Sequence, residues 1–264
     1  MTPDELAQAG LVVERSGPVV TVTLHRPEVR NAQTPAMWRA LGTLGGSLDD
    51  DVRVVVLRGA GQSFSAGLDR AMFDTAAGRE GVETLADLLE LPDEEVSATI
   101  EVYQQGFTWL RDPRFVSVAA VRGYAIGAGF QLALSCDLRV VSHDARFSMK
   151  EPALGLVPDL TGTKPLVECV GYARALEICA TARMVEADEA VRIGLAMTAV
   201  PAAMLDATVA DLAGALSAPM VGAVRETKAL LQGAGDRTLD DQRRLEREAQ
   251  VRRFRDLARW HAAG

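Results

Sequence analysis

The chain has 264 residues, of which 48% are apolar and 24% are charged, a composition typical of a soluble globular protein with a sizeable core. Its net charge of −8 argues against nonspecific binding to nucleic acid or to an anionic membrane surface, and no apolar run approaches the roughly 18–20 residues that a membrane helix needs. Three cysteines without a CxxC pair, three scattered histidines and an N-terminus without signal-peptide character predict a cytoplasmic protein with reduced thiols and no metal site.

The first half of the chain alternates strand patterns with helix patterns. Two β-branched runs flank the turn signal Ser16-Gly17-Pro18 and predict a pair of strands. Thr34 precedes a segment with helical spacing of its apolar residues and is the expected N-cap. The predicted strands are 11–17, 18–25, 52–59, 116–123 and 139–142, the predicted helices are 34–48 and 94–112, a third helix begins within 123–138, and the acidic residues 71–92 are expected to form a helix and a mobile loop.

Helical patterns dominate the chain from Gly162 onward. The expected helices are 163–170, 173–180, 187–193, 202–216, 220–231 and 239–258. Alternating strands and helices, followed by helices alone, predict an α/β core with a helical C-terminal part. We therefore expect a core of residues 1–200 and a C-terminal helical region of residues 201–264.

Two segments share one design, in which a buried strand runs into a turn of small residues and then into a helix start. They are VVVLRGAGQSFSAGLDR (54–70) and VAAVRGYAIGAGFQLAL (118–134). Each helix start leaves unpaired N–H groups at the positive end of a dipole, so two such ends aimed at one point would stabilise an oxyanion. The alternative is that both are simply tight turns that pack a core. Gly127-Ala128-Gly129 in the second segment is not a dinucleotide fingerprint, because Leu132 stands where the third glycine belongs.

The stretch KEPALGLVPDL (150–160) holds two carboxylates, Glu151 and Asp159, with only apolar residues, glycine and proline between them. A fully extended chain would separate the two acids by about 26 Å, so a pair requires the fold-back that Pro152, Gly155 and Pro158 permit. Two carboxylates in one apolar pocket would titrate as a coupled pair. The alternatives are a surface role for Glu151 and an N-cap role for Asp159 in the helix that follows it.

Taken together, LHRPEVRNAQTPAM, FSAGLDR, GYAIGAGFQLALSCDLRV and KEPALGLVPD, in this order and spacing, resemble the enoyl-CoA hydratase/isomerase family, also called the crotonase superfamily. EADEAVRIGLAMTAVP continues the resemblance, which covers residues 11–260 or so. It implies a crotonase-like spiral of ββα units whose C-terminal helices build a homotrimer or a dimer of trimers. It also implies an acyl-CoA thioester as substrate, with no cofactor besides the coenzyme A that the substrate carries.

The resemblance assigns binding roles to main-chain groups. The two oxyanion donors map to the N–H groups of Leu68 and Ala128, where the identity of the side chain matters little. The coenzyme A end of the substrate maps to Arg30, Ala32, Ala66 and Asp69.

The resemblance also places the catalytic acids. One family glutamate maps to Glu151, but the other maps to Gln131, and an amide cannot exchange a proton near neutral pH. Asp159 fills a position where dienoyl-CoA isomerases carry an acid. We therefore expect Glu151 to be the principal acid/base, Asp159 its partner and Gln131 a positioning group, which favours isomerisation over hydration. The alternative is a catalytically silent acyl-CoA carrier or regulator, an interpretation that Gln131 keeps open.

Two further features allow a sharper interpretation. Ser65 could be a nucleophile, although no G-x-S-x-G motif or paired histidine supports that role. The last helix is rich in arginine, and a solvated face is the simpler explanation. Arg252 and Arg253 could instead contact coenzyme A phosphates across a subunit interface.

Overall fold

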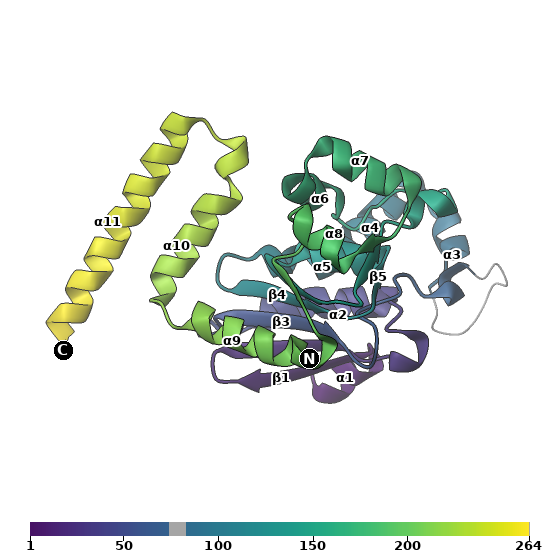
Figure 1. Cartoon of the computed structure of the whole chain (residues 1–264), viewed down its shortest axis with the longest axis horizontal. Coiled ribbons are helices and arrows are strands. Elements are labelled where there is room, and N and C mark those ends of the chain that lie inside the picture. Colours follow the sequence, from purple (N-terminus) through teal and green to yellow (C-terminus); the bar gives the residue numbers. More distant parts are fainter. Residues whose placement is uncertain (74–82, 264) are drawn as a thin grey trace.

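The computed structural model describes residues 1–73 and 83–263. Six strands form the main sheet in the order β1-β2-β3-β4-β6-β9, and three short strands form a second sheet in the order β5-β7-β8 (Figure 1). In the main sheet β1 and β2 are antiparallel and all other neighbours are parallel. The strands are β1 (Leu11–Ser16), β2 (Val19–Leu24), β3 (Val54–Gly59), β4 (Val116–Val121), β5 (Tyr124–Ile126), β6 (Leu138–Ser142), β7 (Arg146–Ser148), β8 (Val185–Glu186) and β9 (Thr198–Val200).

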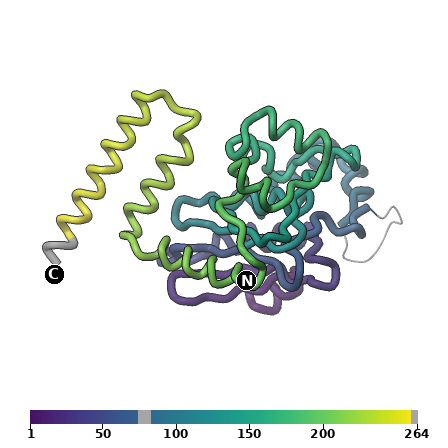
Figure 2. The backbone as a smooth tube through the Cα atoms, in the orientation of Figure 1, coloured from purple at the N-terminus to yellow at the C-terminus, as the bar shows by residue number. Residues whose placement is uncertain are grey.

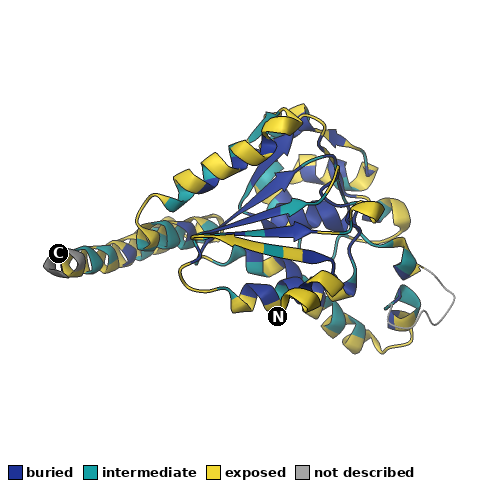
Figure 3. Ribbon diagram, turned by 90° about the horizontal axis from the view of Figure 1, so that it is seen from below, coloured by how far each residue is buried: buried dark blue, intermediate teal, exposed yellow. Residues whose placement is uncertain are grey.

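Helices cover both faces of the main sheet. Successive side chains of its strands point to opposite faces, and apolar side chains lie on both. In β3, Val55 and Leu57 join the larger core cluster, whereas Val54 and Val56 face the smaller cluster beneath α9. Figure 3 shows the central strands buried between helices that are exposed on their outer sides. The helices are α1 (Pro3–Gln8), α2 (Pro35–Ser47), α3 (Leu85–Leu89), α4 (Asp93–Thr108), α5 (Ala128–Ser135), α6 (Thr163–Val170), α7 (Tyr172–Thr181), α8 (Ala187–Arg192), α9 (Leu205–Ser217), α10 (Val221–Gln232) and α11 (Leu239–Ala263).

The observed architecture confirms the predicted α/β class with C-terminal helices. Thr34 caps α2 as expected, since its hydroxyl accepts the N–H of Met37 at 3.2 Å. The predicted helix 94–112 ends earlier, at Thr108, and continues as a 3-10 turn over Trp109–Arg111. Part of the expected helix and loop at 71–92, namely 74–82, lies outside the described residues.

Several short elements carry no strong sequence pattern and were not expected. α1 begins with a capping box between Thr2 and Glu5. The helix has only six residues, too few to show the periodic apolar pattern by which a helix is predicted. β5, β7 and β8 have two or three residues each, and such strands form only because a neighbouring segment offers a hydrogen-bonding edge.

The C-terminal helices differ in how they meet the core. α9 packs on the sheet through Leu205, Val209 and Ala213, whereas α10 and α11 form a hairpin that extends away from the body (Figures 1 and 2). The division at residue 200 therefore stays a prediction, because α9 belongs to the packed core as much as to the helical tail. Among the described residues no single helix could span a membrane, and only the bent pair Ala202–Ser217 and Val221–Asp236 passes on length and composition.

A buried lysine attaches α10 to the core. Lys228 is 8% exposed, and its Nζ donates to the carbonyls of Asp112 and Phe115 and, at 2.7 Å, to Oδ2 of Asp137. Burial lowers the pKa of Lys228, while the charge of Asp137 opposes that effect. The ammonium group therefore replaces its lost hydration with three protein acceptors.

We expect Lys228→Met to destabilise the fold by about 3 kcal/mol, because removing one partner of a buried ion pair leaves the other charge uncompensated. Chemical denaturation measures the change. Lys164→Met is the matched control, since the Lys164–Asp236 pair also joins the core to the tail but its side chains are 66% and 71% exposed. An equal loss in both variants would contradict a special role for the buried pair.

Candidate active site

Glu151 begins a 3-10 turn (Glu151–Leu154) shortly after β7, and its side chain points into the protein. The residue is 9% exposed, and Oε1 accepts a hydrogen bond from Nε2 of Gln131 at 2.7 Å. The second oxygen, Oε2, is buried and has no hydrogen-bond partner among the described residues. Burial, the largest cause, raises the pKa of Glu151, and the bond from Gln131 opposes that rise. One carboxylate oxygen is thus held while the other is available to exchange a proton.

Gln131 lies one turn into α5 and is fully buried. Its Oε1 accepts the backbone N–H of Leu160 at 2.9 Å and that of Gly162 at 3.2 Å. Between them, Thr161 adopts a positive φ of 69°, an unfavourable conformation for a β-branched residue. One amide therefore joins Glu151 to the loop that carries Asp159, and its two bonds hold the strained residue in place.

Asp159 does not cap the following helix. α6 begins at Thr163 with Gly162 as its N-cap residue, and the N–H of Gly162 donates to Gln131 rather than to Asp159. Asp159 is half-buried, burial raises its pKa, and its charge contributes to raising the pKa of Glu151. The chain thus folds back between the two acids, as a carboxylate pair requires.

The two glycine-containing turns converge. A Cβ on Gly67 would lie 2.4 Å from the carbonyl oxygen of Ile126 and 3.5 Å from the nitrogen of Ala128, so only glycine permits this approach. Ala128 is the first residue of α5, where an N–H has no partner inside the helix. Within the described residues, the backbone bonds that hold the turns use neither this N–H nor that of Leu68. The convergence could not be read from the sequence, and the oxyanion role stays a prediction.

The residues expected to hold coenzyme A lie beside the first turn. The carbonyl of Arg30 accepts the N–H of Ala66 at 2.8 Å, and the carbonyl of Ala32 accepts Nη1 of Arg26 at 2.7 Å. The carboxylate of Asp69 forms an ion pair with Arg26, also at 2.8 Å. The four predicted residues are therefore clustered, and their backbones are held in fixed positions.

An apolar groove opens next to the Asp159 loop. Its volume is about 590 Å³, and it lies between α3 and α4. Gln104 connects it to the site, because its Nε2 donates to the carbonyl of Asp159 at 2.6 Å. The lining residues are Leu88, Leu89, Leu91, Asp93, Val96, Ser97, Ile100, Glu101 and Gln104.

A buried polar network behind the first turn was missed at the level of sequence. Ser65, Gln33 and Asn31 are fully buried, and Trp38 is nearly so. Side chains that are more than thirty residues apart in the sequence form no local pattern, so no motif could have revealed their contact. Ser65 uses its hydroxyl in this network, which argues against a nucleophilic role.

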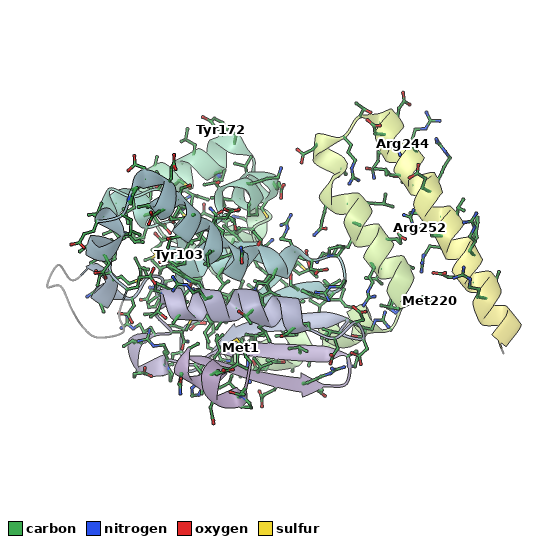
Figure 4. All side chains as sticks on the ribbon, turned by 180° about the vertical axis from the view of Figure 1, so that it is seen from behind. Met1, Tyr103, Tyr172, Met220, Arg244 and Arg252 are labelled. Carbon is green, nitrogen blue, oxygen red and sulfur yellow. The ribbon has the colours of Figure 1, made fainter. Side chains whose placement is uncertain are left out.

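The C-terminal arginines find partners within this chain. Arg252 lies on α11 (Figure 4) and forms a two-pronged ion pair with Glu226 on α10, at 2.7 and 2.8 Å. Arg253 pairs with Asp256 on its own helix.

In the described residues no three side chains of His, Cys, Asp or Glu come together as a metal site would require.

Comparison with known proteins gives a consistent result. The profile of the enoyl-CoA hydratase/isomerase family matches residues 14–259. A protein of Thermobifida fusca YX, provisionally named an enoyl-CoA hydratase and solved in complex with acetoacetyl-CoA, is 50% identical, with a TM-score of 0.93 over 97% of this chain and 98% of its own. The short-chain-enoyl-CoA hydratase of Clostridium acetobutylicum is 30% identical over 242 residues, 90% of this chain and 87% of its own. The mitochondrial Delta(3,5)-Delta(2,4)-dienoyl-CoA isomerase of Rattus norvegicus is 34% identical over 235 residues, 84% of this chain and 68% of its own.

We expect Asp159→Asn to lower the pKa of Glu151, because it removes a negative charge that disfavours ionisation. The pKa should stay above the ordinary value of about 4.3, since burial is the larger cause and remains. Carboxyl carbon NMR titration measures both values. Asp240→Asn, on the α10–α11 hairpin, is the control and should leave the pKa of Glu151 unchanged. An unchanged pKa of Glu151 in Asp159→Asn would show that the two acids do not interact.

Proposed function

Because the chain belongs to the enoyl-CoA hydratase/isomerase family, we propose that it is an enzyme that shifts the double bond of an enoyl-CoA thioester. Family membership favours an enzyme over a catalytically silent acyl-CoA carrier. The complex of the Thermobifida fusca relative with acetoacetyl-CoA supports an acyl-CoA ligand for this chain as well.

We assign the thioester oxygen to the N–H groups of Leu68 and Ala128. When a proton leaves a carbon next to the thioester or conjugated with it, negative charge collects on this oxygen. Two preorganised donors in a water-poor site stabilise that charge at little reorganisation cost. The approach of Gly67 to Ile126 and Ala128 supports this assignment, because it brings the two turns into contact.

Glu151 is the acid/base in this proposal. Gln131 holds Oε1, so Oε2 is the oxygen that takes a proton from the acidified carbon and leaves an enolate. The enolate collapses as a proton returns to a different carbon of the same conjugated system, from Glu151 or from Asp159. The double bond moves and the substrate gains or loses no atom. If Glu151 returns the proton, the site is restored at once; if Asp159 donates it, Asp159 must regain a proton and Glu151 must lose one, directly or through solvent, before the next turnover.

The observation that favours isomerisation is the position of Asp159. It does not cap α6, and its charge contributes to raising the pKa of Glu151, so a second acid can take part in proton return. Hydration is the second candidate, favoured by the name of the Thermobifida fusca relative. Of the two positions where the family carries a glutamate, only Glu151 could then exchange protons with water and substrate, because the amide of Gln131 cannot.

We place the apolar end of the acyl chain in the groove between α3 and α4, which Gln104 connects to the Asp159 loop.

We also propose that the protein is a homotrimer or a dimer of trimers. The α10–α11 hairpin exposes large apolar side chains, a surface that a second copy would cover. These include Leu231, Leu239 and Phe254, which are 69%, 75% and 61% exposed.

We expect Glu151→Gln to lower turnover by about 10²–10⁴-fold, the usual contribution of a general acid/base. Asp159→Asn should reduce isomerisation of 3,5-dienoyl-CoA and 3-enoyl-CoA more than hydration of 2-enoyl-CoA. Steady-state assays on these three substrates measure both effects. Turnover that survives Glu151→Gln intact would remove the assignment, and equal losses on all substrates in Asp159→Asn would remove the preference for isomerisation.

We expect Gln131→Glu to raise the ratio of hydration to isomerisation, because it supplies a second group that can exchange a proton where the amide cannot. The new carboxylate would lie within hydrogen-bond distance of Oε1 of Glu151, so the two would titrate as a coupled pair. Product analysis on 2-enoyl-CoA measures the ratio. A ratio that does not change would show that Gln131 is not what limits hydration.

A further inference from the structure

The hydroxyl of Ser65 has no part in the chemistry proposed above, although it is fully buried in the turn that leads to Leu68. Its Oγ donates to the carbonyl of Asn31 at 2.8 Å. It accepts the backbone N–H of Gly67 at 3.1 Å and Nε2 of Gln33 at 3.0 Å. A serine hydroxyl offers one hydrogen and two lone pairs, so its capacity is fully used. The group is a fixed point of the turn.

Gln33 fixes the same turn from both its side chain and its main chain. Its Oε1 accepts the indole N–H of Trp38 at 2.8 Å, which orients the amide that reaches the serine hydroxyl. Its backbone N–H donates to the carbonyl of Gly67 at 2.7 Å, and its carbonyl accepts the N–H of Asp69 at 2.8 Å. These two bonds bracket Leu68, the residue opposite Gln33 in an isolated parallel bridge.

Ser65 also connects the first turn to the second. Its backbone N–H donates to the carbonyl of Tyr124 at 2.8 Å, and its carbonyl accepts the N–H of Ile126 at 3.0 Å. A Cβ on Gly129 would lie 2.5 Å from the carbonyl oxygen of Ser65 and 3.0 Å from its Oγ, so the serine sits against the first turn of α5. One residue thus contacts the elements that carry both oxyanion donors.

From these contacts we propose that Ser65 and Gln33 are positioning residues that set the direction of the Leu68 N–H relative to that of Ala128. This role rests on the proposed function in one respect, namely that these two groups polarise the thioester carbonyl. Hydrogen bonds weaken steeply as their angle closes, so a small rotation at Gly67 would reduce that polarisation. The main-chain hydrogen bonds of Ser65 and Gln33 do not depend on the serine hydroxyl. Loss of the hydroxyl should therefore change the direction of the Leu68 N–H more than the stability of the fold.

The test is Ser65→Ala, with butyryl-CoA labelled with ¹³C at the thioester carbonyl as the probe. Butyryl-CoA is saturated and has no double bond to shift, so isotope-edited infrared spectroscopy reports carbonyl polarisation without turnover. We expect the wild-type protein to lower the carbonyl stretching frequency and Ser65→Ala to lower it by clearly less. On enoyl-CoA, kcat should fall about tenfold, a fraction of the loss for removing an oxyanion donor outright. KM should change little, since the donors act mainly on the transition state.

Ser142→Ala is the matched control. Ser142 is another fully buried serine, and its hydroxyl bonds to the carbonyl of Val121 and to Asp144, which belong to neither turn. It should leave the carbonyl frequency and kcat as in the wild type, whatever it does to the melting temperature. Should Ser65→Ala fail to fold, Gln33→Met decides the matter, because it keeps the main-chain bonds around Leu68 and should weaken polarisation in the same direction.

A carbonyl frequency and kcat that match the wild type in the folded variant would overturn the positioning role and leave the oxyanion site intact. A wild-type protein that binds butyryl-CoA without lowering the frequency would contradict the oxyanion site itself, and with it the role of Ser65. A frequency that is lowered as predicted, in a protein that turns over no enoyl-CoA, would support the positioning role and count against the proposed reaction.

Discussion

The hydrogen bond between Gln131 and Glu151 connects the groups to which we assign the acid/base chemistry. A carboxylate removed from water needs donors, and here a single amide supplies one while its oxygen holds the backbone at Leu160 and Gly162. Burial makes the native state hold the proton of Glu151 more tightly than the unfolded chain does. The stability due to this proton is therefore present below the unfolded pKa and is lost as the pH rises through the folded pKa.

The main sheet provides the frame on which that bond depends. Its parallel strands are buried on both faces, so the turns that follow β3 and β4 have fixed starting points. The close approach at Gly67 then brings the two turns into contact. The side chains of Ser65 and Gln33, which are hydrogen-bonded to each other, support this contact from the protein interior. The main-chain groups of the proposed oxyanion site are thus held in positions that depend on packing more than on the identity of any one exposed side chain.

The residues of the proposed site could be named from the sequence, because they belong to contiguous motifs that resemble those of a known family. Glu151, Gln131 and Asp159 stand at fixed intervals along segments with distinctive glycine and proline content. The alternatives for Asp159 could not be separated in the same way, since a cap and a pocket residue have the same local sequence. The structure argues against the cap because the N-cap position of α6 falls at Gly162, whose N–H donates to Gln131. The network of Ser65, Gln33 and Trp38 had no local signal at all, because its members come from separate segments.

The sequence by itself determined the class of the fold and the order of the main strands and helices, which follow from periodicity and turn composition, local properties of the chain. Its resemblance to the enoyl-CoA hydratase/isomerase family indicated the residues that we propose for acid/base chemistry. Only the tertiary structure decided that the two glycine turns meet, that Asp159 influences the ionisation of Glu151 and that α9 belongs to the packed core. Contact between distant segments depends on how whole layers pack, and burial, which raises the pKa of both acids, exists only once that packing has formed.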